Sequence, residues 1–287
     1  MARFVQQMVI IFFLIIFLAA LPIMITINPE ENSIEWTFQY VPEAIGNFII
    51  QLSQGSLGTY QVGYQERPIA DDIGDNFMTS LTIMIVGVNA GLILSLIFGI
   101  FISRFRMTKV FNFVMNILSA IPDFILIVFA MLFAIKFYKW TGIRIISLRP
   151  DAGAMNTWFP TMLIGMAPAL YMFKLISVKY YQTGGEDYIR TAVAKGMKLN
   201  YINFHHVFKN IEPFIHAELV KVISLAIGNL FIIEYILNVQ GITKFIFQSF
   251  EVQAMAVGLF AMLLISFIVY VSVRILFYLF KRGFIHE

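Results

Sequence analysis

The side chains of this chain that could do chemistry are few, and several of them lie inside apolar sequence. Asp123 follows Pro122 within one apolar stretch, and Glu234 lies near the end of another. A carboxylate in apolar surroundings is costly, so each is a candidate for a functional role. Asp123 has a structural alternative: Pro122 removes a helical donor, and the carboxylate could bind amides freed beside the kink. Glu234 has one too, because it could tie the following loop, "NVQGI", to its helix.

The remaining titratable groups do not form a catalytic or metal-binding set. Glu218 and Lys221 are spaced i, i+3 and form a neutralising pair if that stretch is helical. His205 and His206 are adjacent, so on a helix they point about 100° apart and cannot easily chelate one metal. There is no cysteine, which excludes disulfides and thiolate sites.

Nucleotide and acyl-transfer motifs are also missing from the sequence. No Ser–His–Asp set has a workable spacing, and no Gly-x-x-x-x-Gly-Lys-Ser/Thr occurs. The nearest string, residues 196–199, lacks both the spacing and the hydroxyl. The sequence therefore predicts a protein that is not an enzyme and holds no cofactor or metal of its own.

The longest polar stretch in the middle of the chain is "EDYIRTAVAKGMKLNYINFHHVFKN", residues 186–210, here called the polar strip. Acidic residues at its start suit a helix N-terminus, and the pattern predicts a helix from Asp187 to Lys195. Ile189, Ala192 and Val193 are expected on one side of it. Gly196 interrupts this helical pattern, and a second one then runs toward Pro213. On residue types alone, a solvated loop at a membrane surface is an equally good interpretation.

The elements that carry these residues are apolar enough to be membrane spans. The chain of 287 residues is 59% hydrophobic and 13% charged, with a mean hydropathy of +0.80. Soluble domains carry roughly 25% charged residues. A helix needs about 20 apolar residues to cross a bilayer. Six stretches qualify, and the predicted spans are Met8–Ile27, Phe77–Ile102, Phe113–Ile135, Trp158–Val178, Phe214–Leu237 and Ala254–Phe280.

The distribution of charge predicts the orientation, because Lys and Arg mark the cytoplasmic side. With the N-terminus inside, the inner segments hold most of the cations, including Arg104, Arg106 and Lys109 and those of the polar strip. The first outer segment, Asn28–Asn76, is acidic, with Glu30 and Glu31 near its start. Both termini are therefore expected to be cytoplasmic. One outer loop departs from the rule, with Lys136, Lys139, Arg144 and Arg149.

Two further patterns concern packing and the outer surface. Gly87, Gly91, Ser95 and Gly99 recur every fourth residue, which favours close packing against another span, with a pore-lining role as the alternative. The outer segment contains a short amphipathic pattern that suits a helix at the membrane surface, with Trp36, Phe38, Ala44, Ile45, Phe48 and Ile49.

The polar strip resembles the EAA loop of ABC importer permeases, in the form found in the dipeptide/oligopeptide permease family. The matching residues are Tyr188, Arg190, Thr191, Ala192, Ala194, Lys195, Gly196, His206, Asn210 and Pro213. "GSLGTYQVGYQERPIADDI", "SAIPDF" and "IIEYILNVQGI" resemble further stretches of that family. Gln240 departs from the usual proline, and Ile242 precedes Thr rather than Gly. The likeness covers roughly residues 55–287.

The resemblance implies an all-α, six-span membrane protein with the type I ABC importer permease fold, multi-pass in the bacterial inner membrane. It implies an N-terminal span over residues 1–27, an extracytoplasmic segment over 28–76, and a permease domain over 77–287 with a coupling loop at 179–213. The expected ATPase-coupling residues are Tyr188, Arg190, Thr191, Ala192, Ala194, Lys195 and Gly196. Asp123 and Glu234 are candidates for the translocation path.

The expected partners follow from the same resemblance. They are a second, similar permease, two ATPases that bind the ATP, an extracytoplasmic substrate-binding protein, which the outer segment could receive, and the lipid bilayer, with no nucleic acid. The implied substrate is a peptide. A permease for nickel or another metal chelate and a non-transporting signalling or assembly protein on this fold are the alternatives. An ion-coupled carrier is disfavoured, because no internal repeat is found.

Overall fold

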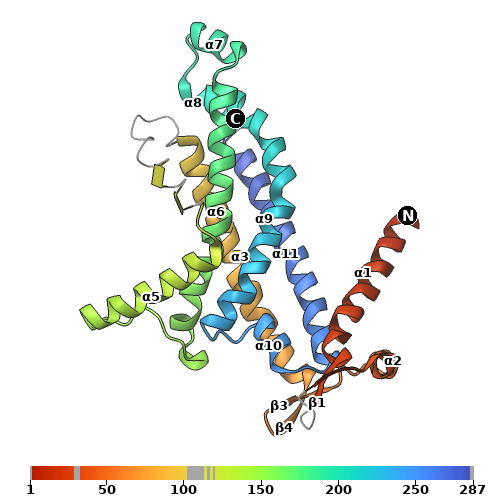
Figure 1. Ribbon diagram of the computed structural model, residues 1–287. Helices are drawn as coiled ribbons and strands as arrows, with labels where there is room; N and C mark the ends of the chain where they lie inside the picture. The colour runs from red at the N-terminus through yellow and green to blue at the C-terminus, as the bar shows by residue number, and fades with distance from the viewer. Residues whose placement is uncertain (1, 29–32, 102–112, 115–116, 119, 285–287) are drawn as a thin grey trace. The chain divides into compact units, whose positions relative to one another are not determined.

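The computed structural model describes residues 2–28, 33–101, 113–114, 117–118 and 120–284 (Figure 1). Arg104, Arg106 and Lys109, three of the predicted inner cations, lie outside these residues, as do Glu30 and Glu31. Within the described ranges, six helical stretches are long and apolar enough to cross a membrane. They are α1 (Ala2–Ala20) with the short η1 (Leu21–Met24), α3 (Ile69–Phe101), α5 (Asp123–Thr141), α6 (Ala154–Gly184), the run from α8 (Leu199–Tyr201) through η5 (Ile202–Phe208) to α9 (Lys209–Ile236), and α11 (Val252–Phe284).

The six-span, all-helical prediction is confirmed, but several predicted limits are wrong. The first span ends at Met24, because Pro22 opens a 3-10 turn and the β-branched run from Ile25 is extended. The second begins at Ile69, eight residues before the predicted Phe77. Its first turn holds Asp71 and Asp72, and carboxylates there stabilise a helix N-terminus.

The predicted third span, Phe113–Ile135, is wrong at both ends as a continuous helix. The described helix, α5, begins at Asp123 directly after Pro122, whose backbone is extended with ψ 138°. The ring of Pro122 also disfavours the helical conformation at Ile121, so the chain breaks there. α5 then continues to Thr141 and ends at Gly142 in the left-handed conformation, φ 72°. Residues 115–116 and 119 of the predicted span lie outside the described residues.

The described chain divides into two compact units, each considered by itself. The first comprises Met1–Ser80 with Gln240–Ile265, and the second Leu81–Val239 with Ser266–Glu287. α3 and α11 each contribute residues to both.

The first unit joins α1 to short strands and two small helices. β1 (Ile25–Asn28) pairs antiparallel with β2 (Ser33–Trp36), and β3 (Thr59–Val62) with β4 (Gln65–Pro68). Neither hairpin was evident from the hydropathy pattern, because strands of four residues give little periodicity. Between the hairpins lie η2 (Phe38–Tyr40) and α2 (Val41–Ser53), and α10 (Ile242–Gln248) precedes α11. One buried cluster comprises Ile16, Ala19, Ala20, Met24, Phe48, Val252 and Ala256.

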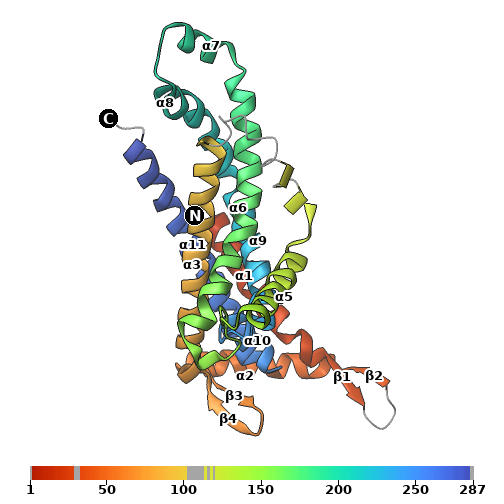
Figure 2. The same cartoon turned by 90° about the vertical axis from the view of Figure 1, so that its left-hand side faces the viewer.

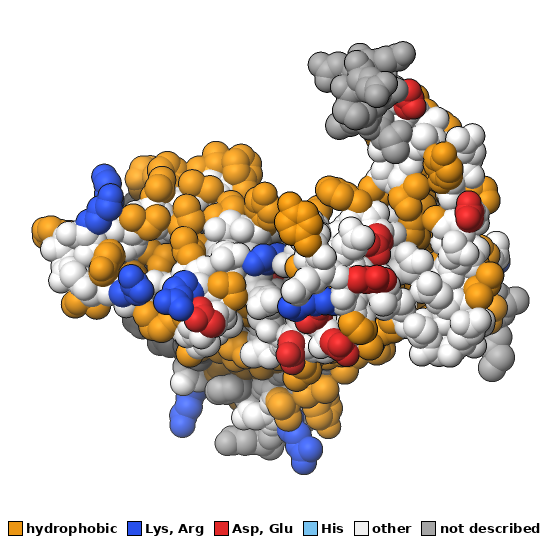
Figure 3. Space-filling model, turned by 90° about the horizontal axis from the view of Figure 1, so that it is seen from below, with side chains coloured by type: hydrophobic (Ala, Val, Ile, Leu, Met, Phe, Trp, Pro, Cys, Tyr) orange, Lys and Arg blue, Asp and Glu red, His pale blue; other side chains and the backbone are white. Residues whose placement is uncertain are grey.

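α2 occupies the predicted amphipathic stretch of the first unit. Phe48 is buried, whereas Ile49 and Ile50 are about half exposed. Trp36 and Phe38 stack with ring centroids 5.6 Å apart, and both rings are mostly exposed. On the face seen in Figure 3, broad apolar areas lie beside scattered acidic and basic side chains. Aromatic rings beside exposed aliphatic chains suit the water–lipid interface.

The second unit is a bundle in which α6 and α9 run antiparallel. Near one end, Asn156 of α6 donates to the carbonyl of Leu237, at 3.4 Å. At the other, the Tyr180 hydroxyl donates to Asn203 in the run that leads into α9, at 2.9 Å. Pro213 lies within α9 and has no N–H to donate to the carbonyl of Lys209. The π-helical η5 lies immediately before α9. α3 lies beside α6 in both Figure 1 and Figure 2.

Candidate functional site

The polar strip folds as the helix–glycine–helix that its sequence predicts. α7 spans Asp187–Ala194 and begins after Glu186, whose carbonyl accepts from the amides of Ile189 and Arg190. Thr191 donates its hydroxyl to the carbonyl of Asp187 at 2.9 Å. The polar strip projects beyond the ends of α6 and α9 in both views (Figures 1 and 2). α7 is therefore held by its neighbours on one side and open on the other.

Gly196 ends the first helix because its backbone is left-handed, with φ 75°. The amide of Gly196 donates to the carbonyl of Val193, and that of Met197 to Ala192, so these two carbonyls near the end of α7 are satisfied. A Cβ at Gly196 would meet nothing within 4 Å. The position therefore demands glycine for its conformation rather than for space.

The two sides of α7 differ from the predicted arrangement. Ile189 and Ala192 are buried, 6% and 4% exposed, and α7 packs on η5. Val193, expected on the same side, is 54% exposed. Successive helical residues point about 100° apart, so Val193 faces outward when Ala192 faces η5. Ala192 thus supports the loop from within rather than facing outward.

The outward surface of the polar strip is more apolar than its basic composition indicates. Arg190, Thr191, Ala194, Lys195 and Lys198 are exposed, as the sequence reading expected. Large apolar and aromatic side chains lie exposed among them, and they are Tyr188, Val193, Met197, Leu199 and Tyr201. Sequence reasoning concentrated on small and basic residues and missed this apolar component. Apolar side chains ringed by cations form a docking surface for a protein partner.

A hydrogen bond brings together two motif residues that are far apart in sequence. Asn210 on α9 donates its side-chain amide to the hydroxyl of Tyr188 at 3.1 Å, and also to the carbonyl of His206 at 2.7 Å. Burial, then the charge of Glu186, raises the pKa of the Tyr188 phenol. The phenol therefore stays neutral and ties α7 to the start of the fifth span.

A second tie joins the base of α9 to the end of α11. The carboxylate of Glu212 accepts from the ammonium of Lys281, with both oxygens 3.1 Å from Nζ. His216 lies one turn along α9 with Nε2 3.6 Å from Glu212, and its ring meets Phe277 of α11. This pairing could not be predicted from local pattern, because Glu212 and Lys281 are 69 residues apart.

The small-residue stripe of α3 meets α6 at close range. A Cβ on Gly91 would overlap the carbonyl oxygen of Gly165, and one on Gly87 would lie 2.5 Å from that of Thr161. A Cβ on Gly99 would lie 2.6 Å from Ile176. Ser95 is buried and donates to its own helix at Leu92. In this unit the stripe is a helix-packing surface.

The two carboxylates proposed for a path take different positions. Asp123 begins α5, and its carboxylate accepts from the side-chain amide of Asn229 on α9 at 3.3 Å. The alternative that Asp123 binds amides freed beside Pro122 finds no such hydrogen bond among the described residues. Glu234 is fully buried, and its carbonyl accepts from the amide of Val239, which closes the turn after α9. Sequence reasoning missed Asn229, although an amide within an apolar span is itself a signal.

Glu218 and Lys221 make the predicted pair, and Tyr171 joins them. Their charged atoms are 3.9 Å apart. The Tyr171 hydroxyl donates to Glu218 at 2.5 Å, and the Lys221 ammonium lies 4.7 Å from the Tyr171 ring. Over the described residues, no group of three metal-ligating side chains comes together.

The structure is that of a polytopic helical membrane protein. It has six spans, a helical loop that packs on the ends of two of them, and close helix packing at glycines. Comparison with known proteins then places it: residues 91–286 match the model of the binding-protein-dependent transport system inner membrane component family, and the chain belongs to that family. It is a multi-pass protein of the cell membrane, and its family consists of transport components rather than enzymes.

Similar proteins of known function agree with this assignment. The chain is 25% identical over 211 residues to the glutathione transport system permease protein GsiC of Escherichia coli, covering 72% of this chain and 66% of that protein. It is 24% identical over 212 residues to the protein of the same name from Shigella flexneri, with the same coverage. For the Pectobacterium atrosepticum protein the identity is 23% over 217 residues, covering 74% and 68%.

Proposed function

We propose that this protein is a permease subunit of an ATP-driven importer and that the polar strip is its contact with the ATPase. The observation that carries the proposal is the geometry of α7. Its inner side packs on η5, its end is fixed by Gly196, and its outer side presents Val193 beside exposed cations. A short helix held in this way can enter a cleft on a soluble partner without unfolding.

The partners follow from what the chain lacks and from its size. No nucleotide-binding motif occurs in the sequence, so the ATP is bound by two partner ATPases. Six spans enclose too small a bundle for a peptide-sized path, which calls for a second, similar permease. An extracytoplasmic binding protein delivers the substrate. Transport then proceeds by rocking of the two permeases as ATP drives their coupling helices together.

The proposed substrate class is short peptides. The relatives named above are permeases for glutathione, which is itself a tripeptide. This chain is identical to those permeases at about a quarter of the aligned positions, so we expect it to share their mode of transport. The binding protein selects the individual substrate.

Copurification of the ATPase tests the coupling role. The tagged wild-type protein, purified in mild detergent with its neighbouring gene products, is expected to retain an ATPase and a second permease. Val193→Asp with Leu199→Asp places charge in the exposed apolar surface and is expected to lower ATPase recovery at least tenfold, about the loss of one binding hot spot. Tyr64→Asp, at an exposed turn outside the polar strip, is the control and is expected to change nothing.

Retention of the ATPase by the Val193/Leu199 double variant would contradict the coupling role. A wild-type chain that purifies alone, without ATP hydrolysis in any combination, would contradict the importer function as a whole.

A further inference from the structure

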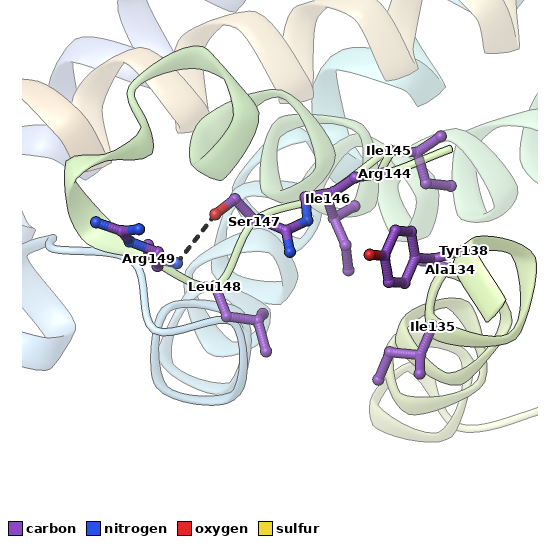
Figure 4. Close-up of a pocket in the computed structure, with 9 residues that line it drawn as sticks. All are labelled: Ala134, Ile135, Tyr138, Arg144, Ile145, Ile146, Ser147, Leu148 and Arg149. Atoms are coloured by element: carbon purple, nitrogen blue, oxygen red, sulfur yellow. Dashed lines mark hydrogen bonds between the residues drawn. The ribbon is translucent and has the colours of Figure 1, made fainter. Parts of the chain in front are cut away.

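A cavity of about 280 Å³ lies where α5 meets the loop that leads to α6. One wall comes from α5, with Ala134, Ile135 and Tyr138. The other comes from the loop, with residues 144–149. Figure 4 shows the aliphatic chains of Ile135 and Leu148 on either side and Arg144 beside the Tyr138 ring. The cavity is therefore apolar in its walls with a cation at its edge.

The loop wall is held rigidly although it contains no helix or strand. The indole of Trp158 donates to the carbonyl of Ile145 at 2.7 Å. Asn156 and Asn238 donate their side-chain amides to the carbonyls of Ser147 and Leu148, both at 2.9 Å. These three hydrogen bonds come from α6 and from the turn after α9, so the cavity is formed in advance of any ligand.

Two arginines line this cavity, Arg144 and Arg149, and only Arg149 has a carboxylate partner among the described residues. Arg149 pairs with Asp151 at 2.7 Å. Arg144 lies over the Tyr138 ring, with its guanidinium carbon 5.5 Å from the ring centre. No ion pair is found for Arg144 within the part of the chain that the structure describes. The site thus carries uncompensated positive charge.

The cavity also lies at the edge of the membrane. α5 is a candidate span that ends at Thr141, so the loop after it lies at headgroup level. The most apolar part of α5 is only 17% buried, the lowest share among the candidate spans of the described chain. Phe133 and Trp140 are exposed on it, as is typical of a lipid-facing helix with an aromatic residue at its interfacial end.

We propose that this cavity binds the headgroup of an anionic phospholipid. The phosphate lies against Arg144, and the glycerol and upper acyl chain lie against Ile135 and Leu148. The apolar walls favour an amphiphile over a free ion. The ligand also accounts for the basic loop on the predicted outer side, because its cations serve binding and do not set orientation.

Native mass spectrometry of the full-length protein, released from nanodiscs, tests the proposal. In discs of equal phosphatidylcholine and phosphatidylglycerol, the wild type is expected to retain one phosphatidylglycerol in preference to phosphatidylcholine. Arg144→Gln is expected to weaken that retention about fivefold, the effect of removing one cation near the lipid surface. The control is Arg274→Gln, whose guanidinium also stacks on a tyrosine, Tyr270, at 5.2 Å.

Three results would overturn the assignment. The first is equal retention of the two lipids by the wild type. The second is equal loss in the Arg144 and Arg274 variants, which would mark a general charge effect. The third is displacement of phosphatidylglycerol by millimolar inorganic phosphate, which would make the ligand a soluble phosphate rather than a lipid.

Discussion

At the scale of single residues, the fold of the polar strip depends on one backbone conformation and one hydrogen bond. Gly196 takes φ 75° with open space around its Cα. Non-glycine residues pay roughly 1–2 kcal/mol there, and asparagine pays least. Gly196→Val is expected to lower ATPase recovery and transport strongly, and Gly196→Asn to retain most of both. Uptake assays with matched expression check this order.

The ranking separates conformation from size. Valine and asparagine are of similar volume, so equal loss in both variants would mean that bulk at this position, and not its left-handed backbone, disturbs the contact.

The bond between Tyr188 and Asn210 is also testable by pH. The folded-state pKa of Tyr188 is raised above the ordinary 10.0, mainly by burial. The stabilisation from the neutral phenol is therefore complete below pH 10 and is lost as pH rises through the folded pKa. Hydrogen exchange of the α7 amides is expected to accelerate in that alkaline range.

Tyr188→Phe is the matched variant, because it removes the acceptor but keeps the ring. The variant is expected to lower the free energy of local unfolding of α7 by about 1 kcal/mol at neutral pH. It is also expected to abolish the acceleration of hydrogen exchange at alkaline pH. An unchanged acceleration in the Phe variant would assign the titration to another group.

At the scale of elements, α3 and α6 pack closely because glycines at their contact carry no side chains. Gly91→Ala forces a methyl group into the carbonyl of Gly165, and overpacking of this kind costs about 1–3 kcal/mol. Gly228→Ala on α9 is the control, since a Cβ there meets nothing within 4 Å. The midpoint temperature of thermal unfolding in detergent is expected to fall for Gly91→Ala. It is expected to stay level or rise for Gly228→Ala, because alanine favours the helical conformation. A pore-lining role for Gly91 alone would leave both stabilities unchanged.

The limits of elements were predicted less well than their number. The apolar run of α3 identified a span, but its acidic first turn was assigned to the preceding loop, since hydropathy alone does not register helix capping. At Pro122 hydropathy predicted a helix that is too continuous. Pro122 lies within an apolar run, yet it breaks the helix there because it restricts the backbone at Ile121.

At the scale of the whole molecule, the orientation in the membrane remains a prediction from charge. The chain has no cysteine, so single cysteines can be introduced without background. Tyr64→Cys and Val193→Cys are suitable, because both positions are exposed. A membrane-impermeant thiol reagent is expected to label position 64 in intact spheroplasts and position 193 only in inverted vesicles. The reverse pattern would invert the topology and place the polar strip outside.

The sequence by itself determined the class of protein and the helix–glycine–helix pattern of the polar strip. Both rest on local information: apolar runs long enough to span a bilayer, and a continuous motif with glycine at its turn. The tertiary structure decided what each motif residue does. Ala192 packs inward while Val193 faces out, Tyr188 meets Asn210, and Glu212 meets Lys281. It also gathered Arg144 and the end of α5 around one cavity. These relations join residues across separate helices, and only the packing of those helices fixes which side chains meet.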